Sequence, residues 1–584
     1  MKEPEVHHPH GMNSLSAAVA SLQARVARLE EHLGLTPAVQ SEATTVTVPA
    51  EVEPLDIPAT SHSSPQLPSL GFAFLILAGA FLLRALTENR VVDGTFGIIL
   101  GLAYTLILLF LTNRAAARGD SSRATLFGLA TTLVAYPLVW ETATRLSLLP
   151  PSGAAGIIVL VTGLGLSLAV RHSLRGLAWF ILLATLTTLI GLYWAADQTT
   201  LFAALIVALG VATVWLGYLQ DWQGPQWLVA SVANFLVFLT VMLASRPADQ
   251  LPDGPKPAPD AVIPLALALP VVYLGSFSLR TMLQKREAGV FEITQSLGCL
   301  LAGYLGAVRL LRIGDGSTVA LGWATLVAAA AGYGVAFTFV RQRQGRGLNF
   351  FYHAWLGLLL TMLGTALVVS GVWLPYLWGG LAVAVAVAGG RYDRWTLRLH
   401  CAAYLIGATA LTGLPAVVFD AFVAPASRTW HSLSGPGIVV WLAAIACYGL
   451  LVATHRRCEL STWRRLPRFL IAVIVLVGAG SLLVTTLAAW LTDRITGQEG
   501  ATVAVVRTAV LAATAMGLGA VSRHQPIIEL AWFVNPLLVL TGLKLLLEDL
   551  RRGTPISLFF GFTLFGVALI VTSRLHRLES RAKL

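Results

Sequence analysis

The chain has 584 residues, of which 56% are hydrophobic and only 12% are charged, and its mean hydropathy is +0.74. An ordinary soluble domain has about 25% charged residues. The composition excludes a water-soluble enzyme and indicates a protein solvated mainly by lipid. Lys and Arg number 40 against 29 Asp and Glu. In a chain of this kind the excess is expected from membrane topology, so we predict no nucleic-acid partner.

The polar N-terminal region divides into three predicted segments. Residues 1–12 form a disordered tail, and residues 36–68, rich in Pro, Ser, Thr and Ala, form a flexible linker. Between them, residues 13–35 favour a parallel coiled coil that joins two copies of the chain. An amphipathic helix packed on the protein or on the membrane surface is the alternative. Alternating steps of four and three residues define the heptad seam, which consists of Leu15, Val19, Leu22, Val26, Leu29 and Leu33.

Residues 69–575 are predicted to form a polytopic transmembrane domain, so the fold class is all-α. The region has no preceding signal-peptide pattern, and we expect its first apolar run to be retained. Apolar runs of about 20 residues recur along it, each long enough to cross a bilayer. We predict about eighteen spans, which begin near residues 69, 94, 124, 153, 174, 198, 226, 261, 288, 318, 349, 372, 396, 436, 466, 501, 526 and 555.

Loop charge predicts the orientation of these spans, because Lys and Arg concentrate on the cytoplasmic side. Basic residues gather in alternate loops, for example Arg114 and Arg118, Arg171 and Arg175, and Arg391. The pattern predicts that both termini lie inside, with the chain ending in a basic tail at residues 576–584. On the outer side, the loop from Ala416 to Gly435 is expected to lie along the membrane surface or to re-enter it.

Known catalytic and binding motifs are missing from the sequence. We find no P-loop, nucleophile elbow, metalloprotease or dinucleotide-binding motif, and the four cysteines have no metal-ligand spacing. We therefore predict no metal and no cofactor, and a non-catalytic protein is favoured.

Ionisable residues near span ends form the candidate site, because charge buried in hydrocarbon is costly unless it finds a partner or water. Opposite charges at i,i+4 spacing end three different spans at one predicted outer level. These residues are Arg84 and Glu88, Glu141 and Arg145, and Lys544 and Glu548, with Asp549 next to the last pair.

Two interpretations of these pairs remain open. Each pair can neutralise itself and anchor its helix end at the interface. Alternatively, the pairs share an outward-facing polar cavity in which Arg84 and Lys544 bind an anionic group while Glu141 titrates or pairs with them. Glu292 and Glu529 are interpreted as ordinary interface residues.

Four segments have a distinctive sequence: Phe81–Asn89, Leu146–Pro151, Lys544–Leu550 and Ser573–Leu575. They resemble one bacterial family of multi-spanning membrane proteins with a domain of unknown function. The resemblance covers about residues 70–195 and 540–577. It implies a polytopic protein of the cytoplasmic membrane with an N-terminal coiled coil, and it brings no established activity.

Three functions are compatible with the sequence. The leading hypothesis is a transporter or flippase-like protein for a small or lipid-linked substrate. The second is a membrane-embedded transferase of envelope polymers or lipids, with Glu88 or Asp93 as base and Arg84 or Arg145 binding phosphate. The third is a non-catalytic envelope scaffold oligomerised through residues 13–35. Membrane lipids are the expected partners in each case.

Overall fold

We describe the protein from a computed structural model. The residues that it describes are 78–79, 93–196, 198–247, 257–283, 287–340, 347–425, 430–454, 462–492, 499–522, 527–552 and 554–582. The predicted coiled coil, the linker and almost all of the first predicted span lie outside them.

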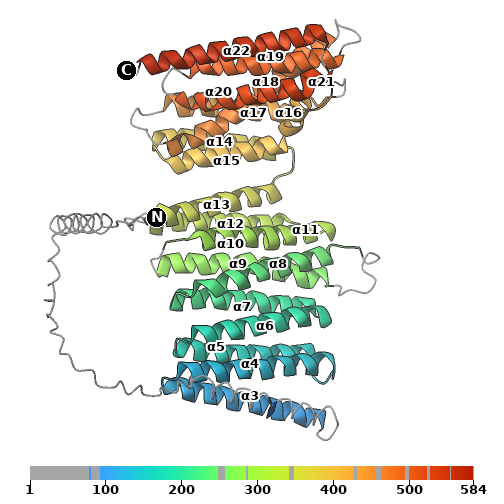
Figure 1. Ribbon diagram of the computed structural model, residues 1–584, viewed down its shortest axis with the longest axis vertical. Helices are drawn as coiled ribbons and strands as arrows, with labels where there is room; N and C mark the ends of the chain where they lie inside the picture. Colours follow the sequence, from blue (N-terminus) through green and yellow to red (C-terminus); the bar gives the residue numbers. More distant parts are fainter. Residues whose placement is uncertain are drawn as a thin grey trace, which may run out of the picture. The chain divides into compact units, whose positions relative to one another are not determined.

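Within these ranges the regular elements are all helical (Figure 1). The first part of the unit contains α3 (Gly94–Ala117), α4 (Ser121–Thr144), α5 (Pro151–Arg171), α6 (Arg175–Ala195), α7 (Thr199–Gln220), α8 (Gln223–Ala244), α9 (Pro259–Leu283), α10 (Val290–Cys299), η2 (Leu300–Tyr304), α11 (Leu305–Ile313), α12 (Val319–Gly334), η3 (Val335–Val340) and α13 (Gly347–Val368). The second part contains α14 (Leu374–Arg391), α15 (Trp395–Leu411), α16 (Leu414–Phe422), α17 (Gly435–Ala453), η4 (Thr462–Arg465), α18 (Leu466–Thr492), α19 (Glu499–Val521), η5 (Ile528–Leu530), α20 (Ala531–Lys544), η6 (Leu545–Asp549), α21 (Leu550–Arg552) and α22 (Pro555–Ala582).

The all-α polytopic class is confirmed. In the part of the chain that the structure describes, fifteen helices are long and apolar enough to cross a membrane, or sixteen if one bent pair counts as a single span. From residue 94 onward, a helix or helix pair lies at each predicted span. Three predicted spans are missing from the fifteen: the first, which lies almost entirely outside the described residues; α14, which is short and rich in Gly and Ala; and the bent pair α15 and α16, which raises the count to sixteen when it is included.

The bent pair is α15 and α16, whose axes differ by 72°. Gly413 lies between them with φ +75°, a left-handed conformation that glycine adopts without steric cost. Pro415 follows at the start of α16, where its missing N–H costs no hydrogen bond. The direction change turns α16 away from the axis of α15. The bend comes just before the predicted outer loop from Ala416 to Gly435, and most of α16 lies inside that loop.

Helices pack in chain order. α4 packs against α3, α5 and α6, α7 against α8 and α9, and α19 against α18, α20 and α22. Every extensive packing pair among the described elements joins spans that are consecutive or next but one. Figure 1 shows the same succession of helices, from α3 to α22.

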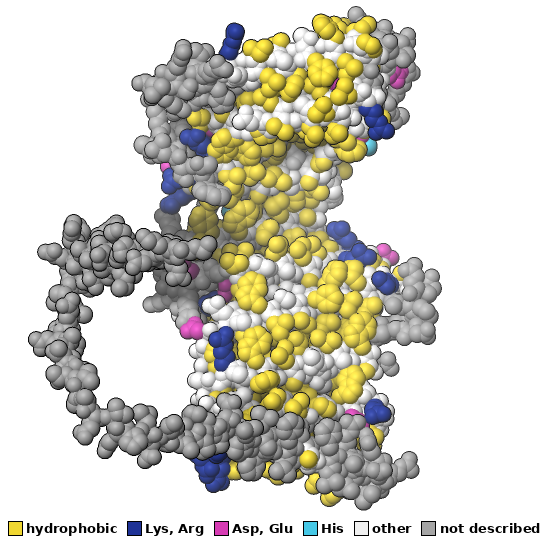
Figure 2. All heavy atoms as spheres, in the orientation of Figure 1, with side chains coloured by type: hydrophobic (Ala, Val, Ile, Leu, Met, Phe, Trp, Pro, Cys, Tyr) yellow, Lys and Arg dark blue, Asp and Glu magenta, His cyan; other side chains and the backbone are white. Residues whose placement is uncertain are grey.

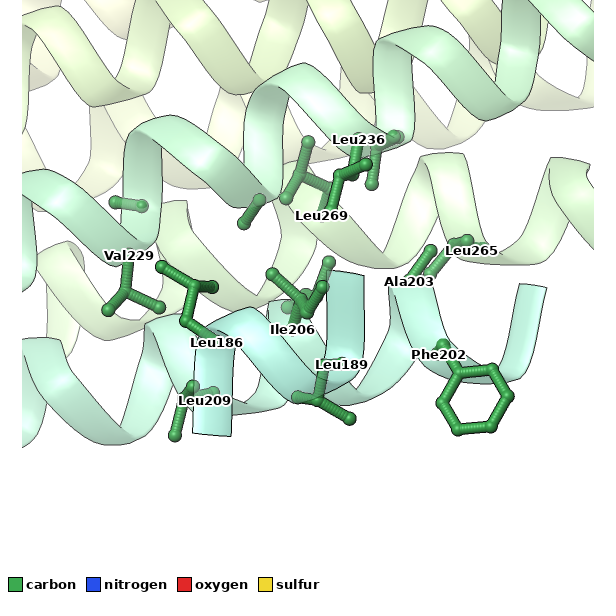
Figure 3. Close-up of a cluster of buried hydrophobic side chains, with 14 of the residues drawn as sticks. Leu186, Leu189, Phe202, Ala203, Ile206, Leu209, Val229, Leu236, Leu265 and Leu269 are labelled. Carbon is green, nitrogen blue, oxygen red and sulfur yellow. The ribbon is translucent and has the colours of Figure 1, made fainter. Parts of the chain in front are cut away.

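A core of apolar side chains joins α6, α7, α8 and α9, as Figure 3 shows for Leu186, Ile206, Leu236 and Leu269. Small residues let the helices approach closely. A Cβ atom on Gly210 of α7, for example, would lie 2.0 Å from the hydroxyl of Tyr273 on α9. In lipid, close van der Waals packing of this kind is a main source of helix association.

The outer surface of the helical part of the chain, residues 93–582, is apolar, as expected for contact with lipid. Figure 2 shows hydrophobic side chains across one face, with Lys and Arg toward its margins. Large exposed side chains include Phe96, Phe110, Val271 and Val327, the last two each 70% exposed. The chain is therefore an integral membrane protein by the chemistry of its surface as well as by its composition.

Candidate functional site

The structure separates the predicted site residues. Arg84 and Glu88 lie outside the described residues. Glu141 and Arg145 form an ion pair at the end of α4, with 3.5 Å between Nη1 and Oε1. The side chain of Arg145 is 68% exposed, so this pair has the geometry of a self-neutralising interface anchor.

Lys544, Glu548 and Asp549 lie elsewhere, at the junction of α20 and η6. η6 packs against α19, α20, α21 and α22, whereas α4 packs against α3, α5 and α6. Glu141 and Lys544 therefore do not contribute to one common site. The interpretation in which Glu141 pairs with Lys544 is not supported by this packing.

A local change of helix type brings the three C-terminal residues together. Residues Leu545–Asp549 form a turn of π-helix, in which hydrogen bonds run between residues i and i+5. The wider turn places Asp549 beside Lys544, where a regular α-helix would rotate it away. The Lys544 ammonium is 2.5 Å from Asp549 Oδ1 and 3.7 Å from Glu548 Oε2.

Helix α19 completes this cluster. The Lys544 ammonium donates to the hydroxyl of Thr508 at 2.7 Å and to the carbonyl oxygen of Ala504. Thr508 in turn donates to Asp549 Oδ2 at 2.8 Å. All the charged atoms of the Lys544–Asp549 pair thus have partners, which offsets the cost of keeping them out of water.

Arg507 is the central residue of the cluster, and it is not among the site residues predicted from the sequence. Its side chain is 1% exposed, and its Nη1 lies 2.6 Å from Glu548 Oε1. Nε donates to the carbonyl of Ala421 at 2.6 Å, and Nη2 donates to the carbonyls of Asp420 at 2.9 Å and Ala424 at 2.5 Å. These carbonyls belong to the C-terminal end of α16, where helices leave backbone acceptors unsatisfied.

We call Arg507, Thr508, Lys544, Glu548 and Asp549 the C-terminal charge cluster. It contains two cations and two carboxylates, so its formal charge is zero. It connects three separate elements: the end of α16, the middle of α19 and the π-turn η6. The bonds of Arg507 therefore tie α16 to α19.

A cavity of about 620 Å³ lies next to the cluster, between α16, the segment before α17, and helices α18 and α19. We call it the Trp430 cavity. The Trp430 ring lines it and also lies 5.6 Å from the Arg507 guanidinium carbon, within range of a cation–π contact. The remaining lining residues are Val417, His431, Ser432, Leu433, Leu482, Thr485, Thr486, Ala488, Ala489, Thr492, Glu499 and Val503.

The wall of the cavity is fastened to α16 by a second contact. Asp420 Oδ2 accepts hydrogen bonds from the backbone N–H and the Nδ1 of His431, each at 2.7 Å. The segment that carries Trp430 and His431 is therefore held to the same helix end that Arg507 binds.

Two further buried ion pairs correct the interpretation of Glu292 and Glu529 as interface residues. Glu292 is 3% exposed, and it pairs with Arg280 and accepts from Tyr218 at 3.2 Å. Glu529 is fully buried and lies 3.5 Å from Nε of Arg468. Both carboxylates lie inside the helix packing because a cation from another helix neutralises each of them.

The transferase hypothesis named Asp93 as a base, and the structure gives this residue another task. Its carboxylate caps α3 by accepting from the backbone N–H of Thr95 at 3.1 Å and from the Thr95 hydroxyl. These bonds hold the pKa of Asp93 below its ordinary value. A base stabilised in its charged form is a weaker proton acceptor.

Metal binding finds no support in the described ranges, which contain no group of three or more His, Cys, Asp and Glu side chains able to hold an ion. No protein-family model, curated protein or solved structure matches the chain. The geometry on which a function can be built is thus the Trp430 cavity and the C-terminal charge cluster behind it.

Proposed function

We propose that the protein is a transporter or flippase-like protein that binds the polar group of a small or lipid-linked substrate in the Trp430 cavity. The observation that carries this proposal is the cavity itself, at about 620 Å³ within the range of ligand-binding cavities. No covalent chemistry is assigned to it.

The lining of the cavity suits an amphiphilic ligand. Hydroxyl groups of Thr485, Thr486 and Thr492 come from α18, and Glu499 adds a carboxylate from the first turn of α19. Leu433 and Leu482 supply apolar surface. A ligand with a hydrogen-bonding head and an apolar portion satisfies both kinds of wall.

In this proposal the charge cluster links the cavity to the π-turn η6. Arg507 bonds both to the end of α16, which borders the cavity, and to Glu548 of η6. A ligand that displaces α16 would strain this link and favour a second arrangement of α19 and η6. Buried networks with two discrete arrangements are the kind of element that couples a site to a conformational change.

The proposed location is the cytoplasmic membrane of a bacterium, with both termini inside. The orientation rests on the alternating Lys and Arg content of the loops, and the bacterial cytoplasmic membrane rests on the resemblance of residues 70–195 and 540–577 to a bacterial family. It would place the Trp430 cavity toward the outer face, where α15 ends and α17 begins.

The proposal is tested by native mass spectrometry of the full-length protein purified from its own membranes. Ala489 lines the cavity, so Ala489→Trp should fill it. Leu483→Trp is the matched control, because Leu483 lies on the same helix and is 50% exposed outside the cavity. We expect a bound amphiphile of defined mass in the wild type and in the control, and its loss in Ala489→Trp. An adduct retained in both variants, or none in the wild type, would refute the proposal.

A scaffold is the second candidate, and one observation favours it. The helices pack in chain order, so the described residues show no pair of halves that face each other across a central site, as transporters with inverted repeats do. A wild-type protein without any bound amphiphile would favour the scaffold.

A further inference from the structure

A lipid-facing stripe runs along the span formed by α10, η2 and α11. Its apolar members are large and exposed, and they recur at intervals of three or four residues on one side of the span. They are Val290, Ile293, Leu297, Leu301 and Leu305, whose exposed fractions range from 41% to 74%.

Two arginines end this stripe. Arg309 and Arg312 follow Leu305 by four and seven residues and are exposed on the same side of α11. Neither has an acidic partner or a hydrogen bond among the residues that the structure describes, although Asp315 follows closely in the chain. Elsewhere the protein supplies such a partner, as Glu141 does for Arg145.

A shallow groove of about 510 Å³ lies at these arginines. Leu305, Val308 and Ile313 form its apolar lining, and Arg309 and Arg312 form its basic lining. Two guanidinium groups one helical turn apart present several N–H donors in a geometry that matches phosphate oxygens. The apolar residues continue from the groove directly into the stripe.

We propose that this groove binds an anionic phospholipid, with the phosphate between Arg309 and Arg312 and an acyl chain along Leu305, Leu301 and Leu297. The dimensions agree. From Arg309 to Leu297 the helix rises about 18 Å, and one leaflet contributes about 15 Å of hydrocarbon. Charge complementarity selects the occupant, since a zwitterionic lipid brings an added cation toward two arginines that have no carboxylate of their own.

The lipid site is independent of the proposed substrate cavity, which is formed by other helices. The proposed lipid site and the proposed function can therefore be refuted separately, because Ala489→Trp changes only the cavity and substitutions at Arg309 and Arg312 change only the groove.

The test is a titration of delipidated full-length protein with phosphatidylglycerol, followed by native mass spectrometry. Phosphatidylcholine and inorganic phosphate serve as parallel probes. We expect the wild type to bind phosphatidylglycerol with a preference over phosphatidylcholine and to bind no inorganic phosphate at equal concentration. In Arg309→Gln/Arg312→Gln the apparent affinity for phosphatidylglycerol should fall about thirtyfold, as expected from the loss of two cations beside an anionic headgroup.

The control is Arg171→Gln/Arg175→Gln, which removes two exposed arginines from the junction of α5 and α6, far along the chain from the groove. This variant should bind phosphatidylglycerol like the wild type. An equal loss in both double variants would show general surface attraction and overturn the site. Retention of phosphatidylglycerol in Arg309→Gln/Arg312→Gln would overturn the site as well. Binding of inorganic phosphate without phosphatidylglycerol would also overturn it, because it would identify a simple anion site. Thermal unfolding of both variants in the same detergent excludes misfolding as the cause.

Discussion

Arg507→Met is expected to destabilise the protein strongly, because it leaves a carboxylate and three carbonyls without their cation. The lost bonds are the 2.6 Å ion pair to Glu548 and the three bonds to the end of α16. Removal of one partner from a buried ion pair costs about 3–5 kcal/mol. Glu548 is 17% exposed, so partial access to water should place the cost near the lower limit, about 3 kcal/mol.

A second substitution separates the charge effect from the packing effect. In the Arg507→Met background, Glu548→Leu removes the stranded carboxylate and should recover about 1–3 kcal/mol. The control is Arg145→Met, which breaks a surface ion pair and should change stability by less than about 1 kcal/mol.

The free energy of unfolding is measured by titration with sodium dodecyl sulfate in mixed micelles. Three cysteines, Cys299, Cys401 and Cys447, are buried and unpaired, so a thiol-reactive fluorophore should label them only after unfolding. Cys458→Ser removes the fourth thiol. A cost below about 1 kcal/mol for Arg507→Met, or a double variant less stable than the single one, would refute the assignment of Arg507 as the ion that holds α16 to α19.

Two further outcomes follow from local geometry. Gly210→Ala should destabilise the protein by about 1–3 kcal/mol, because its Cβ would clash with the Tyr273 hydroxyl. The control is Gly156→Ala, whose Cβ meets no atom within 4 Å and which should leave the free energy of unfolding unchanged. The same denaturant titration measures both variants. The Asp93 cap on Thr95 should also weaken at acid pH. Its pKa is lowered in the folded protein, so its contribution is present above the ordinary value of 3.8 and is lost as the pH falls through the folded value. The protection factors of the amides at the start of α3, corrected for the intrinsic exchange rate at each pH, should therefore fall in the wild type but not in Asp93→Asn, and an equal fall in both would contradict the role of the carboxylate.

The positions of the helices could be predicted because a bilayer-length apolar run has few alternative structures. The start of α3 at Gly94 and of α6 at Arg175 lie within one residue of the predicted starts. The sequence could not predict that a helix ends at Gly413, since glycine is common in membrane spans and only its backbone conformation reveals the turn.

The candidate site was predictable only where contacts follow local spacing. The Lys544–Glu548 pair has the i,i+4 spacing of an α-helix, but its stronger partner Asp549 depends on a π-turn that no pattern in the sequence indicated. Arg507 contacts residues that precede it by more than 80 positions. Such pairings are set by tertiary packing. The available signal was the presence of a lone arginine within an otherwise apolar span, which by itself marks a residue that requires a partner.

The chain-order packing of the helices has a consequence for biogenesis. A helix that leaves the ribosome finds its packing partners among the one or two helices inserted just before it, so little of its polar surface has to wait in lipid for a distant segment. Arg507 is an exception in reach but not in order: its carbonyl partners at the end of α16 are synthesised three helices earlier, and Glu548 follows in the next span. Insertion and assembly can therefore proceed together, from the first helices to the last.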